Sequence, residues 1–219
     1  SFLSSAVAVK AFFVVSGFLI FMSFERSTTI AVYAKKRIRR IYPAYSTVVM
    51  LCAISFLAVS SKNIGDYFSL SWGKYVFANL TFLNFLQPTL PGVFGSNKFA
   101  VINGALWTLK IEALFYLSVP LFVFLFRKFT HLSVLILAYG LSVAYAGFFA
   151  VVAERTGSGV YLDLGRQLPG QLSYFMAGAF LYYFLPLFER RIGYFLVAAI
   201  LTLATNLFFP LPLLEPFAI

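Results

Sequence analysis

Long apolar runs, broken by short polar or basic stretches, dominate the chain. Only Lys10 interrupts the first run, and the third contains Lys110 and Glu112. Each run is near or above the ~20 residues that a helix needs to cross ~30 Å of hydrocarbon, and none alternates in polarity as transmembrane β-strands do. The pattern predicts an all-α polytopic transmembrane helical bundle, with about six spans plus one re-entrant or interfacial helix. The runs cover residues 6–24, 41–61, 106–126, 129–153, 167–188 and 192–214.

The basic residues predict the orientation of these spans, because Lys and Arg gather at cytoplasmic span ends. The main basic groups lie at 35–40, 127–128 and 190–191. All three groups are cytoplasmic if successive spans cross the membrane in alternating directions. The inward spans are then 6–24, 106–126 and 172–188, and the outward spans are 41–60, 132–152 and 193–213.

Two external segments follow from this orientation. Residues 61–105 contain an apolar core, 75–86, which is short for a span and typical of a re-entrant or interfacial helix. A crossing by 75–86 is the alternative, although it would place the later basic pairs on the wrong side. Residues 154–171 are polar and predict a loop in which Asp163 and Arg166 form a surface pair.

Composition excludes several classes of protein. Of the 219 residues, 61% are hydrophobic and 11% charged, whereas a soluble domain is roughly 45–50% apolar and about 25% charged. The net charge of +10 lies mostly at the ends of apolar runs, not on a hydrophilic face, so we expect no nucleic-acid partner. The single cysteine, Cys52, excludes a disulfide framework or a metal site built from cysteines.

The basic cluster "KKRIRR" at 35–40 allows two interpretations. In a helix, Tyr33, Arg37 and Arg40 lie at i, i+4 and i+7, on one face. Arginine at both stacked positions suits bidentate binding of phosphate or carboxylate. The alternative is that the whole cluster binds anionic lipid headgroups, at about 1 kcal/mol per basic residue.

Glu112 is the most unusual charge in the chain. A charge near the bilayer centre costs about 2.5–3.5 kcal/mol on insertion scales, so such residues usually face a bundle interior or a wet cavity. Thr108, Glu112 and Tyr116 share a helical face, whereas Lys110 points elsewhere. We therefore expect Glu112 to meet a cation from another element, either Lys10 or an arginine of the cluster. The alternative is that these charges lie at the membrane interface and snorkel.

Ser16 and Gly17 form a small notch between bulky aromatic residues of the first span. Small residues let helices approach closely, which is the simpler role for this notch. A place for Ser16 beside the substrate is the alternative. His131, at the beginning of a span, is typical of an interfacial histidine.

Four motifs in this order resemble the acyltransferase 3 family of integral membrane acyltransferases. They are "AFFVVSGFLI" at 11–20, "RIRRIYPAY" at 37–45, "NGALWTLKIEALFYLSVPL" at 103–121 and "RQLPGQLSYFMAGAFLYYF" at 166–184. The resemblance implies transfer of an acyl group, often acetyl, from a cytoplasmic acyl-CoA to a hydroxyl acceptor such as a surface glycan. It also implies a bacterial inner-membrane protein with acyl-CoA as co-substrate, the lipid bilayer as surroundings and no bound cofactor or metal.

The resemblance also implies roles for residues of this chain. Arg37 and Arg40 correspond to the family's arginine pair, which we expect to bind the donor, and Glu112 is the expected catalytic residue. Trp107 corresponds to the family's tryptophan, and Phe115 and Tyr116 to its aromatic pair. The residues expected along the substrate or channel are Lys10, Ser16, Asn103, Trp107, Thr108, Lys110 and Tyr116.

The chain departs from the family pattern at several positions. Lys110 stands where serine is common, Ala113 and Leu114 where a second acid and a glutamine are common, and Lys10 where an acid is frequent. The family's first helix, with the histidine thought to be the base, would precede Ser1. We therefore expect residues 1–219 to be a single transmembrane acyltransferase domain, incomplete at both ends and inactive alone. His131 comes at the wrong place in the motif order to replace that base.

Two other functions remain open at this point. A secondary transporter or exporter could use Lys10, Lys110 and Glu112 as a proton or substrate relay, and would predict internal inverted repeats. A catalytically inactive member of the same fold is the second alternative. A histidine retained in the full-length gene would count against it.

Overall fold

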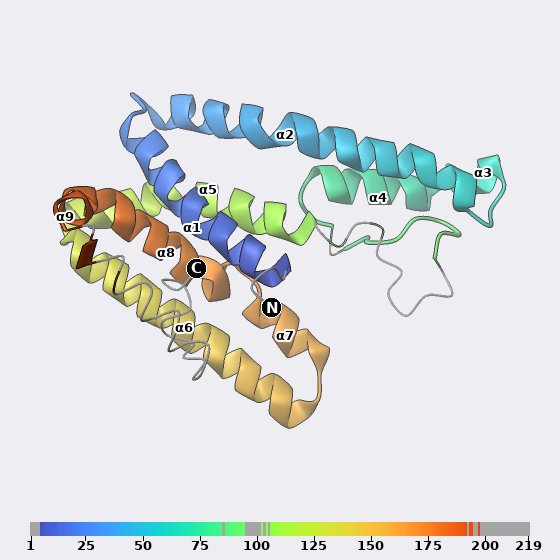
Figure 1. The fold of residues 1–219 in the computed structure, drawn as a ribbon. Helices are drawn as coiled ribbons and strands as arrows, with labels where there is room; N and C mark the ends of the chain where they lie inside the picture. The colour runs from blue at the N-terminus through green and yellow to red at the C-terminus, as the bar shows by residue number, and fades with distance from the viewer. Residues whose placement is uncertain are drawn as a thin grey trace. The chain divides into compact units, whose positions relative to one another are not determined.

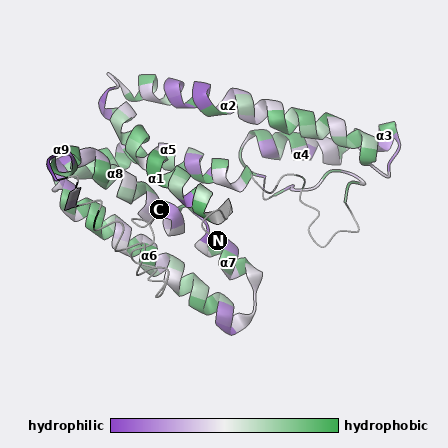
Figure 2. Ribbon diagram, in the orientation of Figure 1, coloured by the Kyte–Doolittle hydropathy of each residue, from purple (hydrophilic) through white to green (hydrophobic). Residues whose placement is uncertain are grey.

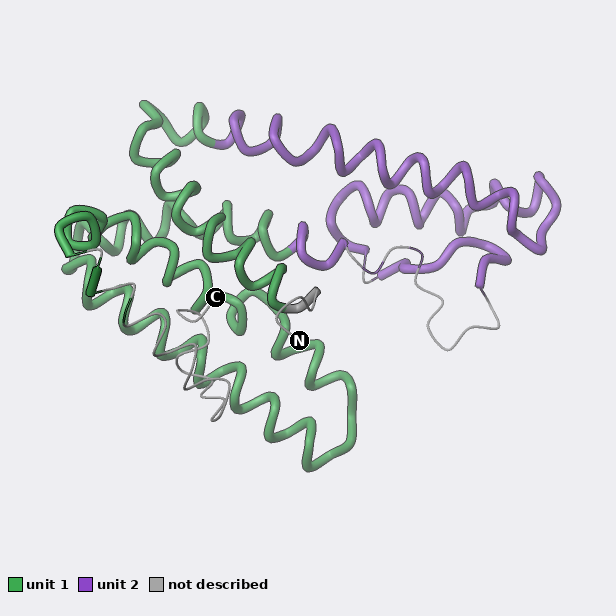
Figure 3. Tube along the Cα trace, viewed as in Figure 1, with its two compact units in different colours: residues 1–33, 111–219 green, residues 34–110 purple. Residues whose placement is uncertain are grey.

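The computed structural model describes residues 5–84, 86–94, 102, 104, 106–191, 193–194 and 197. Within this part every regular element is a helix (Figure 1), which confirms the predicted all-α class. The chain forms two compact units (Figure 3): unit 1 comprises residues 1–33 and 111–219, and unit 2 comprises residues 34–110. The boundaries fall inside helices α2 (Ile30–Ser55) and α5 (Leu106–Lys128), so each of these helices contributes to both units.

Helix α8 (Leu168–Tyr183) forms the core of unit 1. It packs against α1 (Ser5–Glu25) and against α6 (His131–Thr156). Every residue of α8 from 173 to 179 is buried. A helix that is apolar and buried all round belongs to a bundle interior, which explains why this segment reads as a span in the sequence. The unit also contains α7 (Gly159–Gly165) and α9 (Leu185–Arg190).

Small residues permit the close packing of α8. A Cβ atom on Gly17 of α1 would overlap the backbone of Phe175, so α1 and α8 touch at backbone level. On the other side, the backbone N–H of Ser173 donates a hydrogen bond of 2.8 Å to Oγ of Ser142 on α6. The notch predicted at residues 16 and 17 is therefore a site of close helix approach.

Unit 2 is built on the longer part of α2, which continues into a 3₁₀ turn, Phe56–Val59. Helices α3 (Ile64–Tyr67) and α4 (Leu70–Leu80) follow. The backbone carbonyl of Ala53 accepts hydrogen bonds of 2.9 Å from the hydroxyl of Tyr67 and from Nε1 of Trp72. These bonds tie α3 and α4 to α2. The hydrophobic core of this region consists of Ala53, Tyr67, Tyr75, Leu90 and Val93.

Among the residues that the structure describes, four helical stretches are long and apolar enough to cross a membrane: Val7–Glu25, Ile30–Val59, Leu106–Lys128 and His131–Thr156. They correspond to the first four predicted spans. The second begins earlier than predicted, because α2 runs through Pro43 without a break. The basic cluster is consequently part of this helix, as a hydrophilic stretch near its beginning (Figure 2). A 30-residue stretch is about 45 Å long, so its basic end can lie outside ~30 Å of hydrocarbon.

The fifth predicted span, 172–188, is divided in the structure. Helix α8 ends at Tyr183, and the short helix α9 starts at Leu185 with Pro186 in its first turn. Proline has no N–H to continue the hydrogen-bond ladder, and its ring crowds the preceding turn. Most of the sixth predicted span, 193–213, lies outside the described residues.

The prediction of a loop over 154–171 is wrong. Gly157, with a φ of 65°, ends α6, and α7 then forms and packs back on α6. The ring of Tyr161 stacks on Phe149 with 6.3 Å between centroids, a contact that polarity along the sequence does not reveal. The expected surface pair is present, with 3.7 Å between Oδ1 of Asp163 and Nη1 of Arg166.

The helix expected at 75–86 has different bounds in the structure. Helix α4 ends at Leu80, where the hydroxyl of Thr81 donates to the carbonyl of Phe77 and Phe82 takes a φ of 61°. A left-handed residue cannot continue the helix. With 11 residues, α4 is about 16 Å long and too short to span the hydrocarbon.

Candidate functional site

Glu112 and Tyr116 form a hydrogen-bonded pair inside unit 1. Both are buried on α5, with 3% and 7% of their surface exposed. The hydroxyl of Tyr116 donates a hydrogen bond of 2.5 Å to Oε1 of Glu112. The two side chains meet because residues four apart lie on one face of a helix. The shared face predicted for these two residues is therefore confirmed, and Glu112 lies in the protein interior.

Tyr33 connects the beginning of α2 to this pair. Its hydroxyl donates a hydrogen bond of 3.2 Å to the backbone carbonyl of Tyr116, which lies 83 residues away in the chain. Its ring packs edge-on against Phe24, with 4.9 Å between centroids. The sequence placed Tyr33 on the arginine face of its helix but contained no signal for this partner, because the contact joins two distant segments.

Aromatic rings hold α5 in place next to Glu112. Phe115 stacks on Phe175 of α8 with 3.9 Å between centroids. Phe175 in turn lies 4.7 Å from Phe13 of α1. All three side chains are fully buried. Phe115 also lies edge-on to Phe21 of α1, with 5.9 Å between centroids, so the turn of α5 that carries Glu112 contacts both α8 and α1 through this ring.

Lys10 and Ser16 lie on α1 beside α8. The Nζ atom of Lys10 is 5.6 Å from the centroid of the Tyr174 ring, a distance typical of a cation–π contact. Ser16 is buried, with 4% of its surface exposed. The cation that we expect for Glu112, and the substrate or channel roles of Lys10 and Ser16, stay predictions.

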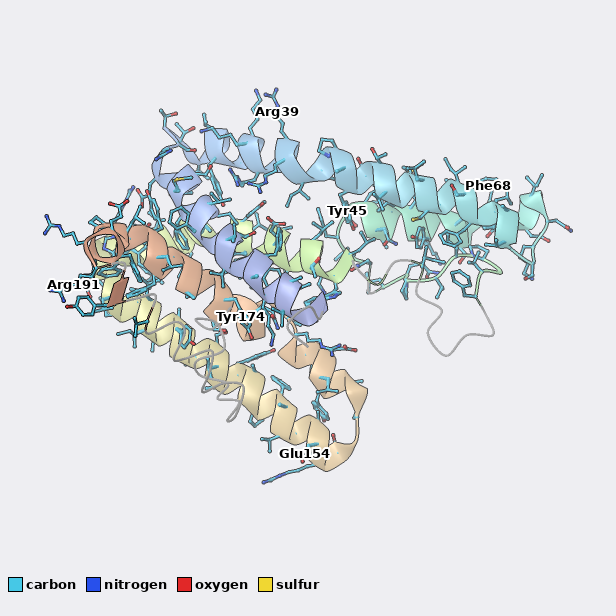
Figure 4. The ribbon with its side chains drawn as sticks, viewed as in Figure 1. Arg39, Tyr45, Phe68, Glu154, Tyr174 and Arg191 are labelled. Atoms are coloured by element: carbon cyan, nitrogen blue, oxygen red, sulfur yellow. The ribbon has the colours of Figure 1, made fainter. Side chains whose placement is uncertain are left out.

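The two arginines of the predicted donor site differ in exposure. Both lie on the part of α2 that belongs to unit 2. Atoms Nε and Nη1 of Arg37 are buried, whereas Arg40 is exposed, as are Lys35, Lys36 and Arg39. Arg39 extends away from the helix in Figure 4. Arg37 is thus the arginine of the cluster whose guanidinium is withdrawn from solvent.

The remaining predicted site residues lie at the beginning of α5. Trp107, Thr108 and Lys110 are partly buried within unit 2. The same turn is anchored by Leu106, which packs with Tyr45 and Val49 of α2. Asn103 lies outside the described residues. The described site residues are accordingly divided between the units. Unit 1 contains Lys10, Ser16, Glu112 and Tyr116, and unit 2 contains Arg37, Arg40, Trp107, Thr108 and Lys110.

A second polar group lies elsewhere in unit 1, at the ends of α1, α6 and α8. The hydroxyl of Tyr183 donates a hydrogen bond of 2.8 Å to Oε1 of Glu25. The exposed ring of His131 lies 4.5 Å from the Tyr183 ring and 5.1 Å from that of Phe126. His131 therefore takes part in aromatic packing. Among the described residues, no group of three or more His, Cys, Asp or Glu side chains could hold a metal ion.

A family model described as an acyltransferase domain, that of the acyltransferase 3 family, matches residues 1–217. The chain is 28% identical over 142 residues to nodulation protein 10 of Rhizobium leguminosarum bv. viciae, a match that covers 62% of this chain and 38% of that protein. It is 32% identical over 114 residues to an O-acetyl transferase of Shigella phage Sf6, covering 52% of this chain and 33% of the phage protein.

A third relative, an uncharacterized protein of Haemophilus influenzae, is 34% identical over 133 residues, which are 57% of this chain and 52% of that protein. The matches thus span between a third and about half of the length of these curated relatives. No solved structure matches the chain.

Proposed function

The chain belongs to the acyltransferase 3 family, and on that premise we propose that it is part of a membrane O-acyltransferase. The enzyme moves an acyl group, acetyl by default, from acyl-CoA to a hydroxyl of a surface or exported glycan. The name of the phage relative, O-acetyl transferase, supports acetyl transfer to oxygen.

The buried carboxylate of Glu112 is the observation that carries this proposal. A carboxylate inside an apolar, span-length helix is costly and is usually retained for a function. Glu112 already accepts one hydrogen bond from Tyr116. A carboxylate can accept about four hydrogen bonds. In the proposed enzyme, Glu112 accepts a hydrogen bond from the glycan hydroxyl that receives the acyl group, or it orients the groups that activate this hydroxyl.

Arg37 and Arg40 are the proposed donor residues. Acyl-CoA carries phosphates, and the guanidinium fork binds phosphate through two parallel charge-assisted hydrogen bonds. The partly buried guanidinium of Arg37 suits such a site, because charge-assisted bonds are stronger away from water. The exposed basic residues around it suit the anionic headgroups of the inner leaflet. Residues 35–40 are cytoplasmic in this arrangement, on the side that supplies acyl-CoA.

The proposed reaction is a transfer between a thioester and an alcohol. The acceptor oxygen attacks the thioester carbonyl carbon, a C–O bond forms, the C–S bond breaks and CoA leaves as a thiolate, which takes its proton from the conjugate acid of the general base. The hydroxyl proton passes to a general base, which the family resemblance assigns to a histidine of a preceding helix. A histidine with a pKa near 6.5 suits this task at neutral pH.

Ester analysis of surface glycans tests the proposal. Glycans from cells with the full-length gene, from a deletion strain and from a Glu112→Gln strain at matched expression are compared for alkali-labile acyl groups. Glu154→Gln, an exposed carboxylate on α6, is the matched control. We expect esters with the wild-type gene and with Glu154→Gln, and none in the other two strains.

The other outcomes are equally informative. Esters that are lost on deletion but retained in Glu112→Gln would uphold the acyltransferase and reject Glu112 as its catalytic residue. No ester difference between wild type and deletion, on glycans or on other envelope molecules, would reject the proposed reaction and favour transport.

A further inference from the structure

We propose that Tyr116 is a positioning residue that fixes the carboxylate of Glu112. Tyr33 in turn holds the backbone of Tyr116, because its hydroxyl donates to the Tyr116 carbonyl. The usual helical donor to that carbonyl is absent because residue 120 is a proline. This inference rests on the proposed function only where it assigns Glu112 a part in acyl transfer. The arrangement itself stands on two buried hydrogen bonds and one proline.

Tyr116 and Glu112 are joined by a hydrogen bond within α5. The hydroxyl of Tyr116 donates to Oε1 of Glu112, and hydrogen bonds from a hydroxyl to an ionised carboxylate are stronger than those between neutral groups. Both side chains are buried, and hydrogen bonds are electrostatically stronger in such surroundings. A glutamate side chain has several rotatable bonds, so a donor at Oε1 selects one orientation of the carboxylate.

Pro120 interrupts the hydrogen-bond ladder of α5. In an α-helix the carbonyl of residue 116 accepts from the N–H of residue 120. Residue 120 of α5 is a proline inside the helix and has no N–H to donate. The hydroxyl of Tyr33 donates to this same carbonyl at 3.2 Å. Tyr33 thus takes the place of the missing helical donor.

The two hydrogen bonds are coupled through the backbone of Tyr116. A buried carbonyl without a donor costs about 1–3 kcal/mol, which the backbone can relieve by shifting. A shift at residue 116 would move the Tyr116 ring and the donor that it presents to Glu112. The preceding residue, Phe115, is fixed separately, because its ring stacks on Phe175 of α8 and not on Tyr33. Tyr33 therefore sets the place of the Tyr116 hydroxyl, and Tyr116 sets that of Glu112.

The test uses full-length protein in membranes with radiolabelled acetyl-CoA as donor and envelope glycans of the deletion strain as acceptor. Tyr116→Phe should lower kcat about 10- to 100-fold with an unchanged KM for acetyl-CoA, because misplacement of a reacting group costs up to about 100-fold. Tyr33→Phe should lower kcat by about 3- to 10-fold, the equivalent of one ordinary hydrogen bond. Tyr183→Phe, which removes the donor to Glu25, is the matched control and should leave kcat unchanged.

Double variants separate positioning from general damage. In a Glu112→Asp background, where the shorter side chain keeps a carboxylate but draws it back from the Tyr116 hydroxyl, Tyr116→Phe should cause no further loss of kcat. Tyr33→Phe should cost less than about twofold in a Pro120→Ala background, since alanine restores the helical donor. Additive losses in either cycle, or a kcat for Tyr116→Phe equal to that of wild type, would overturn the proposal.

An infrared measurement tests the arrangement independently of activity. The carboxylate band of Glu112 is identified by its loss in Glu112→Gln, and it should shift in Tyr116→Phe but not in Tyr183→Phe. A shift without any acetyl transfer by the wild type would uphold the positioning and reject the proposed function. An unshifted band would reject the positioning, whatever the activity.

Discussion

Gly178 on α8 lies against Val14 on α1 so closely that a Cβ atom at position 178 would collide with the Val14 carbonyl. The same atom would lie 2.7 Å from the backbone N of Phe18. Backbone atoms cannot swing aside as side chains do, so these two helices are held at the separation that glycine permits. The aromatic contacts that pack α5 near Glu112 depend on this separation, because Phe175 of α8 supplies the central ring.

Gly178→Ala should accordingly destabilise unit 1. Overpacking of a well-packed core typically costs about 1–3 kcal/mol, and here the neighbour is backbone. Thermal unfolding in detergent measures the effect. Gly140→Ala on α6 is the matched control, since nothing lies within 4 Å of its added Cβ atom. Equal melting temperatures for the two variants would contradict the close contact.

Tyr45→Phe should loosen α4 in unit 2. The Tyr45 hydroxyl donates a hydrogen bond of 2.6 Å to the carbonyl of Asn79 in the last turn of α4, a carbonyl that also accepts from the backbone N–H of Phe82 at 3.0 Å. Loss of the Tyr45 bond should cost about 0.5–1.5 kcal/mol. Hydrogen exchange of residues 70–80 should speed up accordingly, while Tyr42→Phe, exposed on the same helix, should leave the rates unchanged. Unchanged rates in both variants would show that the bond adds nothing to stability.

Alkaline pH should destabilise unit 2 through Tyr67. Burial raises the pKa of this phenol above its ordinary value of about 10. The folded state favours the neutral phenol, so the full contribution of Tyr67 to the stability of unit 2 is present below pH ~10. This contribution is lost as the pH rises through the raised pKa of the folded state. Protease susceptibility of residues 60–94 should therefore increase above pH ~10.

Tyr67→Phe should weaken this pH dependence but not abolish it, because the pKa of Tyr75 is raised as well. Burial is the largest cause of that second shift, and the neighbouring Cys52, Tyr45 and Tyr67 add to it. Tyr194→Phe, at a site with 80% exposure, serves as the control and should leave the dependence as in wild type. An identical pH profile for Tyr67→Phe and wild type would exclude Tyr67 as a source of the effect.

Arg37→Lys should raise the KM for acetyl-CoA about tenfold at unchanged protein abundance. Lysine keeps the charge but loses the planar fork, and hydrogen bonds to charged groups are worth about 1.5–3 kcal/mol. Arg39→Lys, exposed and off the Tyr33–Arg37–Arg40 face, should leave KM unchanged. Parallel changes in both variants, or loss of abundance alone, would point to lipid headgroups as the partner of the whole cluster.

Features that depend on neighbours along the chain were predictable. The four long apolar helices follow from the length and hydropathy of their runs, and the Glu112–Tyr116 pair follows from helical spacing. The predictions that were wrong concern marginal segments. Residues 154–171 read as a loop because their polarity is mixed, yet α7 forms there by packing Tyr161 on Phe149 of α6.

The sequence alone therefore determined the class of the protein, its main helices and the charges most costly to bury, because hydropathy and helical periodicity are local properties. The tertiary structure decided which backbones touch and which donors replace those that proline removes. The Tyr33 hydroxyl reaches a carbonyl 83 residues away, at the position that Pro120 leaves without its helical donor. Local pattern cannot encode such a pairing, since it depends on how the helices fold back on one another.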